Sequence, residues 1–163
     1  LEQSEYKYDI IAVDAYRPPY IPPHMTTQEF FQIIASHLAD DGVLTINSAS
    51  VPGDRRLING LATTMATVFP SIYTVDIPGS LNTMIFATKQ PTIPENFAMN
   101  LLALTQDSSI HPLLISTMQV TFTNLKTGFE PTTVFTDDHA PIEWIVNDMV
   151  IRFILEGGTE FLQ

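Results

Sequence analysis

Cysteine is absent from the 163 residues, which excludes disulfides, thiolate metal ligands and cysteine nucleophiles. Basic residues are scarce, because 7 Lys and Arg stand against 18 Asp and Glu and the net charge is −11. A field of that sign repels phosphate backbones, so we expect no nucleic-acid partner. A cationic small molecule is compatible with the same field.

Long apolar runs are absent too, so the sequence predicts no membrane-spanning helix within it. The first residues have neither the basic nor the apolar region of a signal peptide, and we expect a cytoplasmic protein. The chain also starts without methionine, from which we expect it to be part of a longer parent protein. No G-x-G-x-x-G, P-loop lysine or serine nucleophile elbow occurs.

What is present indicates a globular fold, since 45% of the residues are hydrophobic and 15% are charged. Residues 8–14 (YDIIAVD) predict a parallel strand buried on both faces. After a proline-rich segment, Thr26 and Glu29 have capping-box spacing and predict the start of a helix. Gly42 is suited to the left-handed turn that ends it, and residues 42–47 predict the next strand.

The rest of the chain continues this alternation and then becomes mainly helical. A second helix is predicted over residues 54–68, and residues 71–77 and 82–88 predict an antiparallel hairpin. Later segments show helical periodicity at 97–104, at 113–120 (also compatible with a strand) and from Pro141, with a loop at 123–135. We therefore expect one partial α/β domain over 1–163, with the sheet core and hairpin in 1–90 and a mainly helical extension in 91–163.

Two polar residues stand at the ends of the predicted parallel strands. Asp14 ends the first and Asn47 ends the second, so both belong to the same rim of the sheet. Open α/β sheets bind ligands at this rim. The two side chains indicate a site there; the alternative is that Asp14 only forms a turn and Asn47 only caps the next one.

Asp137, Asp138 and His139 carry the side chains that metals prefer, but adjacent residues rarely converge on one ion. The two aspartates also precede the predicted helix at Pro141, where negative charge favours the exposed N–H groups. We prefer this second interpretation and predict no metal site.

Six stretches of the sequence stand out together: YDIIAVDAY, IPPHMTTQEFF, LADDGVLTINSAS, VFPSIYTV, NTMIFAT and FTDDHAPIEW. They resemble the spermidine synthase (polyamine aminopropyltransferase) family, and most of all its bacterial spermidine synthase-like branch. The strand followed by Asp is shared with many S-adenosylmethionine methyltransferases, whereas the T-DD-x-A-P-x-E stretch is more specific. Members of this branch are often fused to membrane segments, so the resemblance leaves open whether the parent of this chain has such segments.

The resemblance implies the C-terminal half of a Rossmann-like S-adenosylmethionine-dependent methyltransferase sheet of order 3-2-1-4-5-7-6. The four predicted strands correspond to strands 4, 5, 6 and 7, with the front half absent. It further implies that the intact parent uses decarboxylated S-adenosylmethionine, or S-adenosylmethionine, and moves an aminopropyl group to a small-molecule amine. Asp14 corresponds to the catalytic acid, and Tyr16, Arg17, Asn47, Asp137 and Asp138 are its candidate substrate-binding neighbours.

One departure concerns acceptor specificity. The family commonly has Asp-x-x-Asp at this point, whereas this chain has Asp14-Ala15-Tyr16-Arg17. Two alternatives therefore stay open, a methyltransferase portion on the same sheet and a non-catalytic binding or assembly domain. Because the nucleotide-binding glycines are missing, we expect no cofactor bound to this chain alone. We also expect a homodimer, through the open edge that the strand Asp9–Val13 would form without strands 1 to 3 or through the apolar surface that the missing half would have covered.

Overall fold

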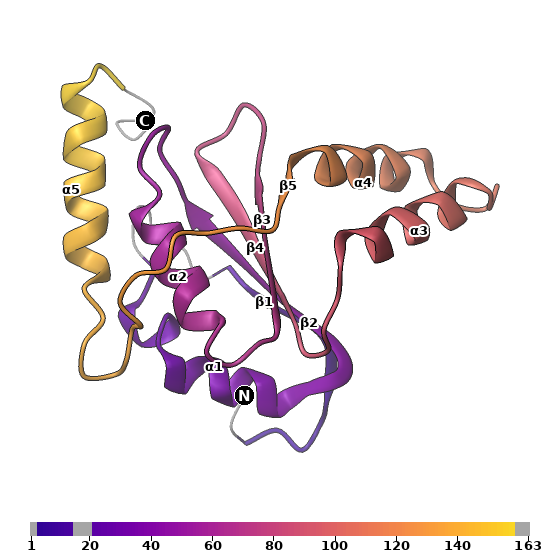
Figure 1. Cartoon of the computed structure of the whole chain (residues 1–163), viewed down its shortest axis with the longest axis horizontal. Coiled ribbons are helices and arrows are strands. Elements are labelled where there is room, and N and C mark those ends of the chain that lie inside the picture. Colours follow the sequence, from indigo (N-terminus) through magenta and orange to yellow (C-terminus); the bar gives the residue numbers. More distant parts are fainter. Residues whose placement is uncertain (1–2, 15–20, 159–163) are drawn as a thin grey trace.

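The computed structural model describes residues 3–14 and 21–158. Its elements are β1 (Tyr8–Val13), a 3-10 turn (Pro23–Met25), α1 (Gln28–His37), β2 (Leu38–Ala49), α2 (Arg56–Met65), β3 (Ser71–Asp76), β4 (Asn82–Thr88), α3 (Pro94–Thr105), α4 (Pro112–Asn124), β5 (Leu125–Lys126) and α5 (Ile142–Leu155). Five strands form one sheet in the order β1-β2-β4-β3-β5 (Figure 1). β1 and β2 are parallel, and the other pairs are antiparallel.

The order of the first four strands confirms the predicted fold class. Family strands 4, 5, 7 and 6 lie side by side in that order, and β1, β2, β4 and β3 do the same. β3 and β4 form the predicted hairpin, with Gly79 at a φ of 72° in the turn between them. That φ lies in the left-handed region, which glycine adopts without steric cost.

The core lies on one face of the sheet, between the strands and the helices α1, α2 and α5. Side chains of β2 and β4 alternate between this face and the opposite one, as a strand requires. The buried positions include Leu44 and Ile46 of β2 and Ile85 of β4, which belong to the same buried cluster as Leu57 and Leu61 of α2. On the other face of β2, residues such as Thr45 and Asn47 are only partly covered.

The first predicted helix ends earlier than expected. α1 stops at His37, and β2 already begins at Leu38, so Gly42 lies inside a strand and has no positive φ. The reason is non-local: β1 pairs Tyr8 with Leu38 and then Ile10 with Val43, leaving extra residues bulged on β2. A Cβ at Gly42 would lie 3.0 Å from the Tyr8 carbonyl oxygen, so glycine permits this close approach.

The N-terminal cap of α1 also shifts by one residue. The Thr27 side chain, not that of Thr26, accepts the hydrogen bond from the Phe30 amide, at 3.3 Å. The Thr26 hydroxyl instead donates to the Pro23 carbonyl at 2.6 Å, which holds the preceding 3-10 turn.

β1 is parallel as predicted, but the expectation that both of its faces are buried is wrong. Only Val13 of this strand is buried, and Ile10 is 67% exposed. The physical reason is its place at the edge of the sheet, with β2 as its single strand neighbour in the described part of the chain.

The second half of the chain contains a projecting helical hairpin, here called the arm (residues 93–124). Residues 113–120 belong to its second helix, α4, and not to a strand. β5 follows directly, inside the segment predicted as a loop, and pairs with β3. The arm extends from one end of the body while α5 lies at the opposite end (Figure 1). Among the described residues, no helix has the length and hydropathy needed to cross a membrane.

Candidate functional site

Asp14 and Asn47 lie beside each other because their strands are parallel and in register. Val13 of β1 pairs with Ile46 of β2, so the next residue of each strand reaches the same rim. The Asn47 side-chain Nδ2 donates a hydrogen bond to Asp14 Oδ1 at 3.1 Å. The structure therefore brings together the two rim residues singled out in the sequence.

Two side-chain oxygen atoms of β2 have no hydrogen-bond partner among residues 3–14 and 21–158. They are Asn47 Oδ1 and Thr45 Oγ1, both buried as atoms, on the same face of β2. A buried acceptor without a donor costs free energy, and such atoms call for a ligand or a water that donates to them. Asp14, by contrast, is exposed, and its carboxylate can accept from an N–H donor at this rim.

The other predicted site residues do not join this pair. Asp137 and Asp138 are exposed in the tight turn that Thr136 and His139 close with two backbone hydrogen bonds. The Asp137 amide donates to Glu29 Oε2 at 3.1 Å. No hydrogen bond in the described part of the chain connects either aspartate to Asp14 or Asn47. Tyr16 and Arg17 lie outside the described residues.

Asp137 instead borders a separate hollow of about 780 Å³ beside the start of α1. His24, Glu29 and Phe30 also line it. The T-DD-x-A-P-x-E stretch thus meets α1 at this hollow. Within residues 3–14 and 21–158, no group of three or more His, Asp or Glu side chains is arranged to hold a metal ion.

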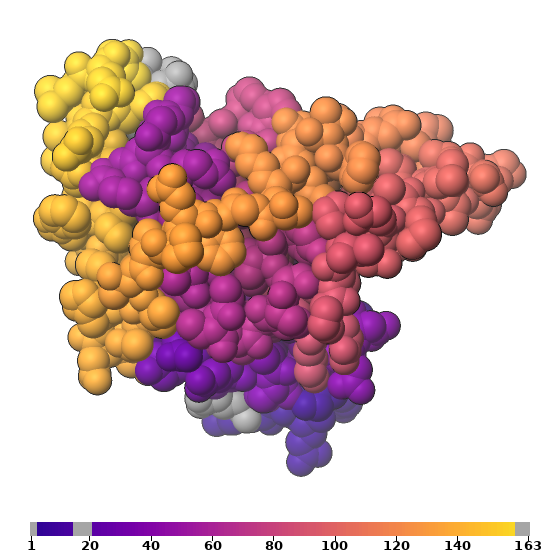
Figure 2. Space-filling view, in the orientation of Figure 1, coloured from indigo at the N-terminus to yellow at the C-terminus, as the bar shows by residue number. Residues whose placement is uncertain are grey.

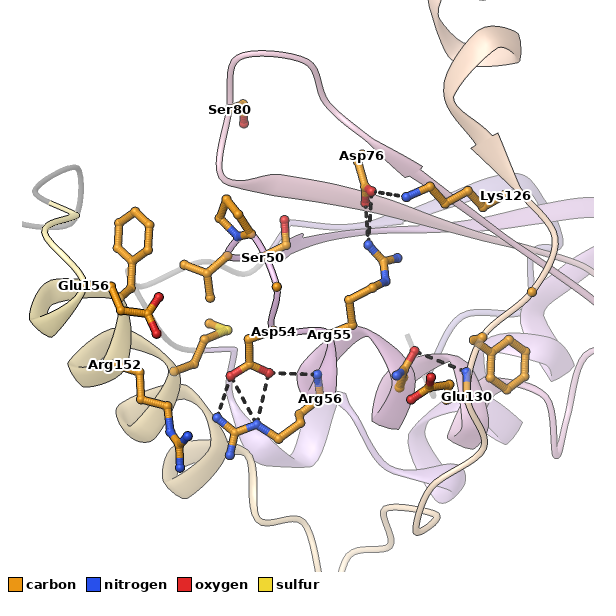
Figure 3. Close-up of a pocket in the computed structure, with 18 residues that line it drawn as sticks. Ser50, Asp54, Arg55, Arg56, Asp76, Ser80, Lys126, Glu130, Arg152 and Glu156 are labelled. Atoms are coloured by element: carbon orange, nitrogen blue, oxygen red, sulfur yellow. Dashed lines mark hydrogen bonds and ion pairs between the residues drawn. The ribbon is translucent and has the colours of Figure 1, made fainter.

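A larger hollow, of about 1430 Å³, lies between α2, α5 and the end of the β3–β4 hairpin (Figure 3). Four of the seven basic residues line it, although the chain is strongly acidic. They are Arg55, Arg56, Lys126 and Arg152. Sequence analysis missed this cluster, because three of its members are widely separated along the chain.

Carboxylates neutralise these cations in two groups. In the first, Asp76 accepts from Arg55 Nη1 through both oxygens at 3.0 Å and from Lys126 Nζ at 2.6 Å (Figure 3). The Thr83 hydroxyl also donates to it, at 2.7 Å. Burial by itself would raise the pKa of Asp76, but the hydrogen bonds from Lys126, Thr83 and Arg55 outweigh it and hold the pKa well below its usual range.

The second group joins α2 to α5. Arg56 pairs with Asp54 at 2.5 Å and with Asp148 at 2.7 Å, and Arg152 pairs with Asp148 at 2.8 Å. The hydrogen bonds from Arg56 lower the pKa of Asp54, and they raise the pKa of Arg56 itself. Because every cation of the hollow has a carboxylate partner, we interpret these contacts as a joint between elements and not as an anion site.

Comparison with known proteins gives a family and a fold. The family model "Spermine/spermidine synthase domain" matches residues 1–100. The chain is 33% identical to a "Probable polyamine aminopropyl transferase" of Bifidobacterium longum, over 176 aligned residues that cover 100% of this chain and 40% of that protein. It is 29% identical to the "Polyamine aminopropyltransferase" of Vibrio vulnificus, over 67% of this chain and 36% of that protein.

Among solved structures, a probable spermidine synthase from Corynebacterium glutamicum superposes with a TM-score of 0.51 at 16% identity. The superposition covers 79% of this chain and 50% of that one, and it supports the fold assigned above. The chain thus spans between a third and a half of the length of these relatives.

Proposed function

The chain belongs to the spermine/spermidine synthase domain family, and from this we propose that it is the C-terminal, acceptor-side portion of a polyamine aminopropyltransferase. The whole reaction is proposed for the longer parent, which would transfer an aminopropyl group from decarboxylated S-adenosylmethionine to a small amine. The observation that carries the proposal is the contact between Asp14 and Asn47 at the rim of the parallel strands.

The chemistry of this rim fits the acceptor amine. An amine is protonated at neutral pH and has to lose a proton before its nitrogen can attack carbon. The Asp14 carboxylate would take that proton as general base, and the neutral nitrogen could then form the C–N bond as the bond from that carbon to the sulfonium sulfur breaks and leaves a neutral thioether. Asn47 would orient the Asp14 carboxylate through the hydrogen bond from Nδ2.

The fit to the cofactor is more limited. Decarboxylated S-adenosylmethionine would supply the electrophilic carbon beside a positive sulfur, and the Asp14 carboxylate suits a positive neighbour. The sequence has no glycine-rich nucleotide loop to hold the adenosine. We therefore assign to this chain the amine and its proton, and no contact with the nucleotide.

The test is an aminopropyl-transfer assay on the longer parent with Asp14→Asn, Asn47→Ala and Asp9→Asn. Loss of the general base should lower kcat by about 10²–10⁴-fold in Asp14→Asn. Asn47→Ala should lower kcat, because it removes the donor that orients Asp14. Asp9→Asn is the matched control, since Asp9 is exposed on the same strand and lies outside the rim.

Unchanged transfer in Asp14→Asn would overturn the role proposed for this carboxylate. Methyl transfer from S-adenosylmethionine, with no aminopropyl transfer, would replace the proposal with the methyltransferase alternative. Activity in neither assay would favour a binding or assembly domain.

The same assay tests the acceptor. Arg17 stands where the family commonly has the second aspartate, and a cation there would repel the far ammonium of a diamine. We expect putrescine to be a poor acceptor and Arg17→Asp to improve its kcat/KM. Efficient turnover of putrescine by the unaltered protein would contradict this expectation.

A further inference from the structure

The tip of the arm, which is the turn 106–111 with the helix ends on either side of it, projects away from the body. In the space-filling view no other segment touches the visible sides of this tip (Figure 2). No residue of α3 or α4 is buried. The stacked rings of Phe97 and Phe122 lie in the first turn of α3 and the last turn of α4, at the base of the arm. Helices of this length are marginal in water without packing, so the order of the tip depends on local hydrogen bonds.

Two side chains supply the local hydrogen bonds of the tip. Asp107 Oδ1 accepts from the Ser109 amide at 2.8 Å and from the Ser109 hydroxyl at 2.7 Å, which closes the turn. His111 is the N-cap residue of α4, and its ring Nδ1 accepts from the Leu113 amide at 3.1 Å. A bond of this kind satisfies one of the first amides of a helix, which have no acceptor within the helix itself.

The hydrogen bond to His111 exists only while the ring is neutral. In the neutral imidazole that carries its proton on Nε2, Nδ1 has a free lone pair for the Leu113 amide, whereas in the protonated ring both nitrogens are donors. Protonation therefore removes the cap. It also places a positive charge at the N-terminus of α4, where the helix dipole disfavours it. Histidine ordinarily changes its charge between about pH 5 and pH 8.

Within the arm, His111 is the side chain whose charge changes near neutral pH. Residues 93–124 contain only two other ionisable side chains, Glu95 and Asp107. Glu95 lies in the first turn of α3, at the base of the arm. Hydrogen bonds from the Ser109 hydroxyl and amide hold the pKa of Asp107 below its ordinary value of 3.8, so this carboxylate keeps its charge over the range in which histidine titrates.

The body contacts α4 through β3. The titratable side chains of this strand are both bonded elsewhere, since the Tyr73 hydroxyl donates to the Thr92 carbonyl at 2.6 Å and Asp76 accepts from Lys126. Lys126 follows the C-terminal end of α4, whereas His111 caps its N-terminal end. The charges of the body therefore lie at the base of the arm and not at its tip.

We propose that His111 is a pH-sensitive cap that controls the order of the tip of the arm. With a neutral ring, the first turn of α4 is fixed by the hydrogen bond to His111; with a charged ring, the Leu113 amide loses its acceptor and this turn frays. The helix has no buried side chain that could compensate for the loss. This role of His111 is independent of the catalytic role of Asp14.

Hydrogen exchange of the Leu113 amide, followed by NMR at about pH 7.5 and at about pH 5, tests the role of His111 in the 163-residue chain. His111→Asn is the reference variant, because an asparagine side-chain oxygen accepts the same hydrogen bond at both pH values. Dividing the exchange rate of the unaltered chain by that of His111→Asn at the same pH cancels the intrinsic pH dependence of exchange. We expect this ratio to be about three- to tenfold higher at the lower pH, which is the effect of losing one N-cap.

Two further variants serve as controls. In His37→Asn the exchanged ring is one whose Nδ1 contacts the Ile33 carbonyl oxygen at 2.8 Å, a bond that needs an N–H and survives protonation, so the rise of the ratio should persist. His111→Ala has no acceptor at either pH, so its ratio should be high and equal at both. A ratio for the unaltered chain that does not change with pH would overturn the proposal, as would a rise that disappears in His37→Asn. A rise shared by the amides of Leu44 and Ile85 would assign the change to the sheet and overturn it too.

Discussion

Asp76 shows how much of this structure depends on one side chain. Its carboxylate at the end of β3 binds Arg55 before α2, Thr83 of β4 and Lys126 of β5. Lys126 comes directly after the arm, so the same carboxylate fixes the base of the arm to the sheet. Because Asp76 is about one-third exposed, solvent screens these pairs, and each contributes modestly.

Asp76→Asn should therefore lower the free energy of unfolding at pH 7 by about 1–2 kcal/mol, as two cations lose their partner. The pKa of Asp76 is lower in the folded chain than its ordinary value of 3.8, so its stabilisation is present above that value and is lost on further acidification. Urea unfolding between about pH 7 and pH 2 should show the difference between the two proteins shrinking below about pH 4.

Asp9→Asn is the control, because Asp9 is an exposed carboxylate on β1, away from these cations. It should leave the stability at pH 7 unchanged. A difference between wild type and Asp76→Asn that stays constant down to about pH 2 would contradict the assignment.

At the scale of elements, a glycine of α2 allows this helix to pack against the segment that precedes α5. Gly60 lies in the middle of the helix, and a Cβ there would come within 2.2 Å of the Phe135 ring. That ring is buried at 2% exposure, and the Phe135 amide donates to Thr64 Oγ1 one turn further along α2. The missing side chain thus allows the segment and the helix to touch.

Gly60→Ala should lower the stability by about 1–3 kcal/mol through overpacking, against a gain in helix propensity of at most about 1 kcal/mol. A double-mutant cycle with Phe135→Leu checks the cause: the alanine should cost much less when the ring is gone. Gly128→Ala is the control, since nothing lies within 4 Å of the added carbon. Equal costs of Gly60→Ala with and without Phe135 would contradict the proposed contact.

For the whole molecule, the sequence predicts weak binding of the nucleotide cofactor. Titration calorimetry of the 163-residue chain with S-adenosylmethionine, and with its decarboxylated form, should give no complex of micromolar or better affinity. The reason is that no glycine-rich loop is present to let a backbone approach the nucleotide. The full-length Bifidobacterium longum relative serves as the comparison protein. A micromolar complex with the chain alone would contradict the prediction.

The sequence by itself determined the features that depend on neighbouring residues. Alternating side chains and a Pro-Gly turn specified the β3–β4 hairpin, and Pro141 marked the start of α5. The adjacency of Asp14 and Asn47 also followed from local information, since two parallel strands must end at one rim. These conclusions needed only periodicity, turn chemistry and strand direction.

Tertiary structure alone decided the features that depend on residues far apart in the chain. Leu38 leaves the helix because β1 pairs with it, and a capping box carries no information about that partner. The charged hollow unites Arg55 with Lys126, 71 positions further along the sequence, and exposure of the arm depends on what packs against it. Such contacts join positions with no fixed spacing in sequence, so a pattern of neighbouring residues cannot specify them.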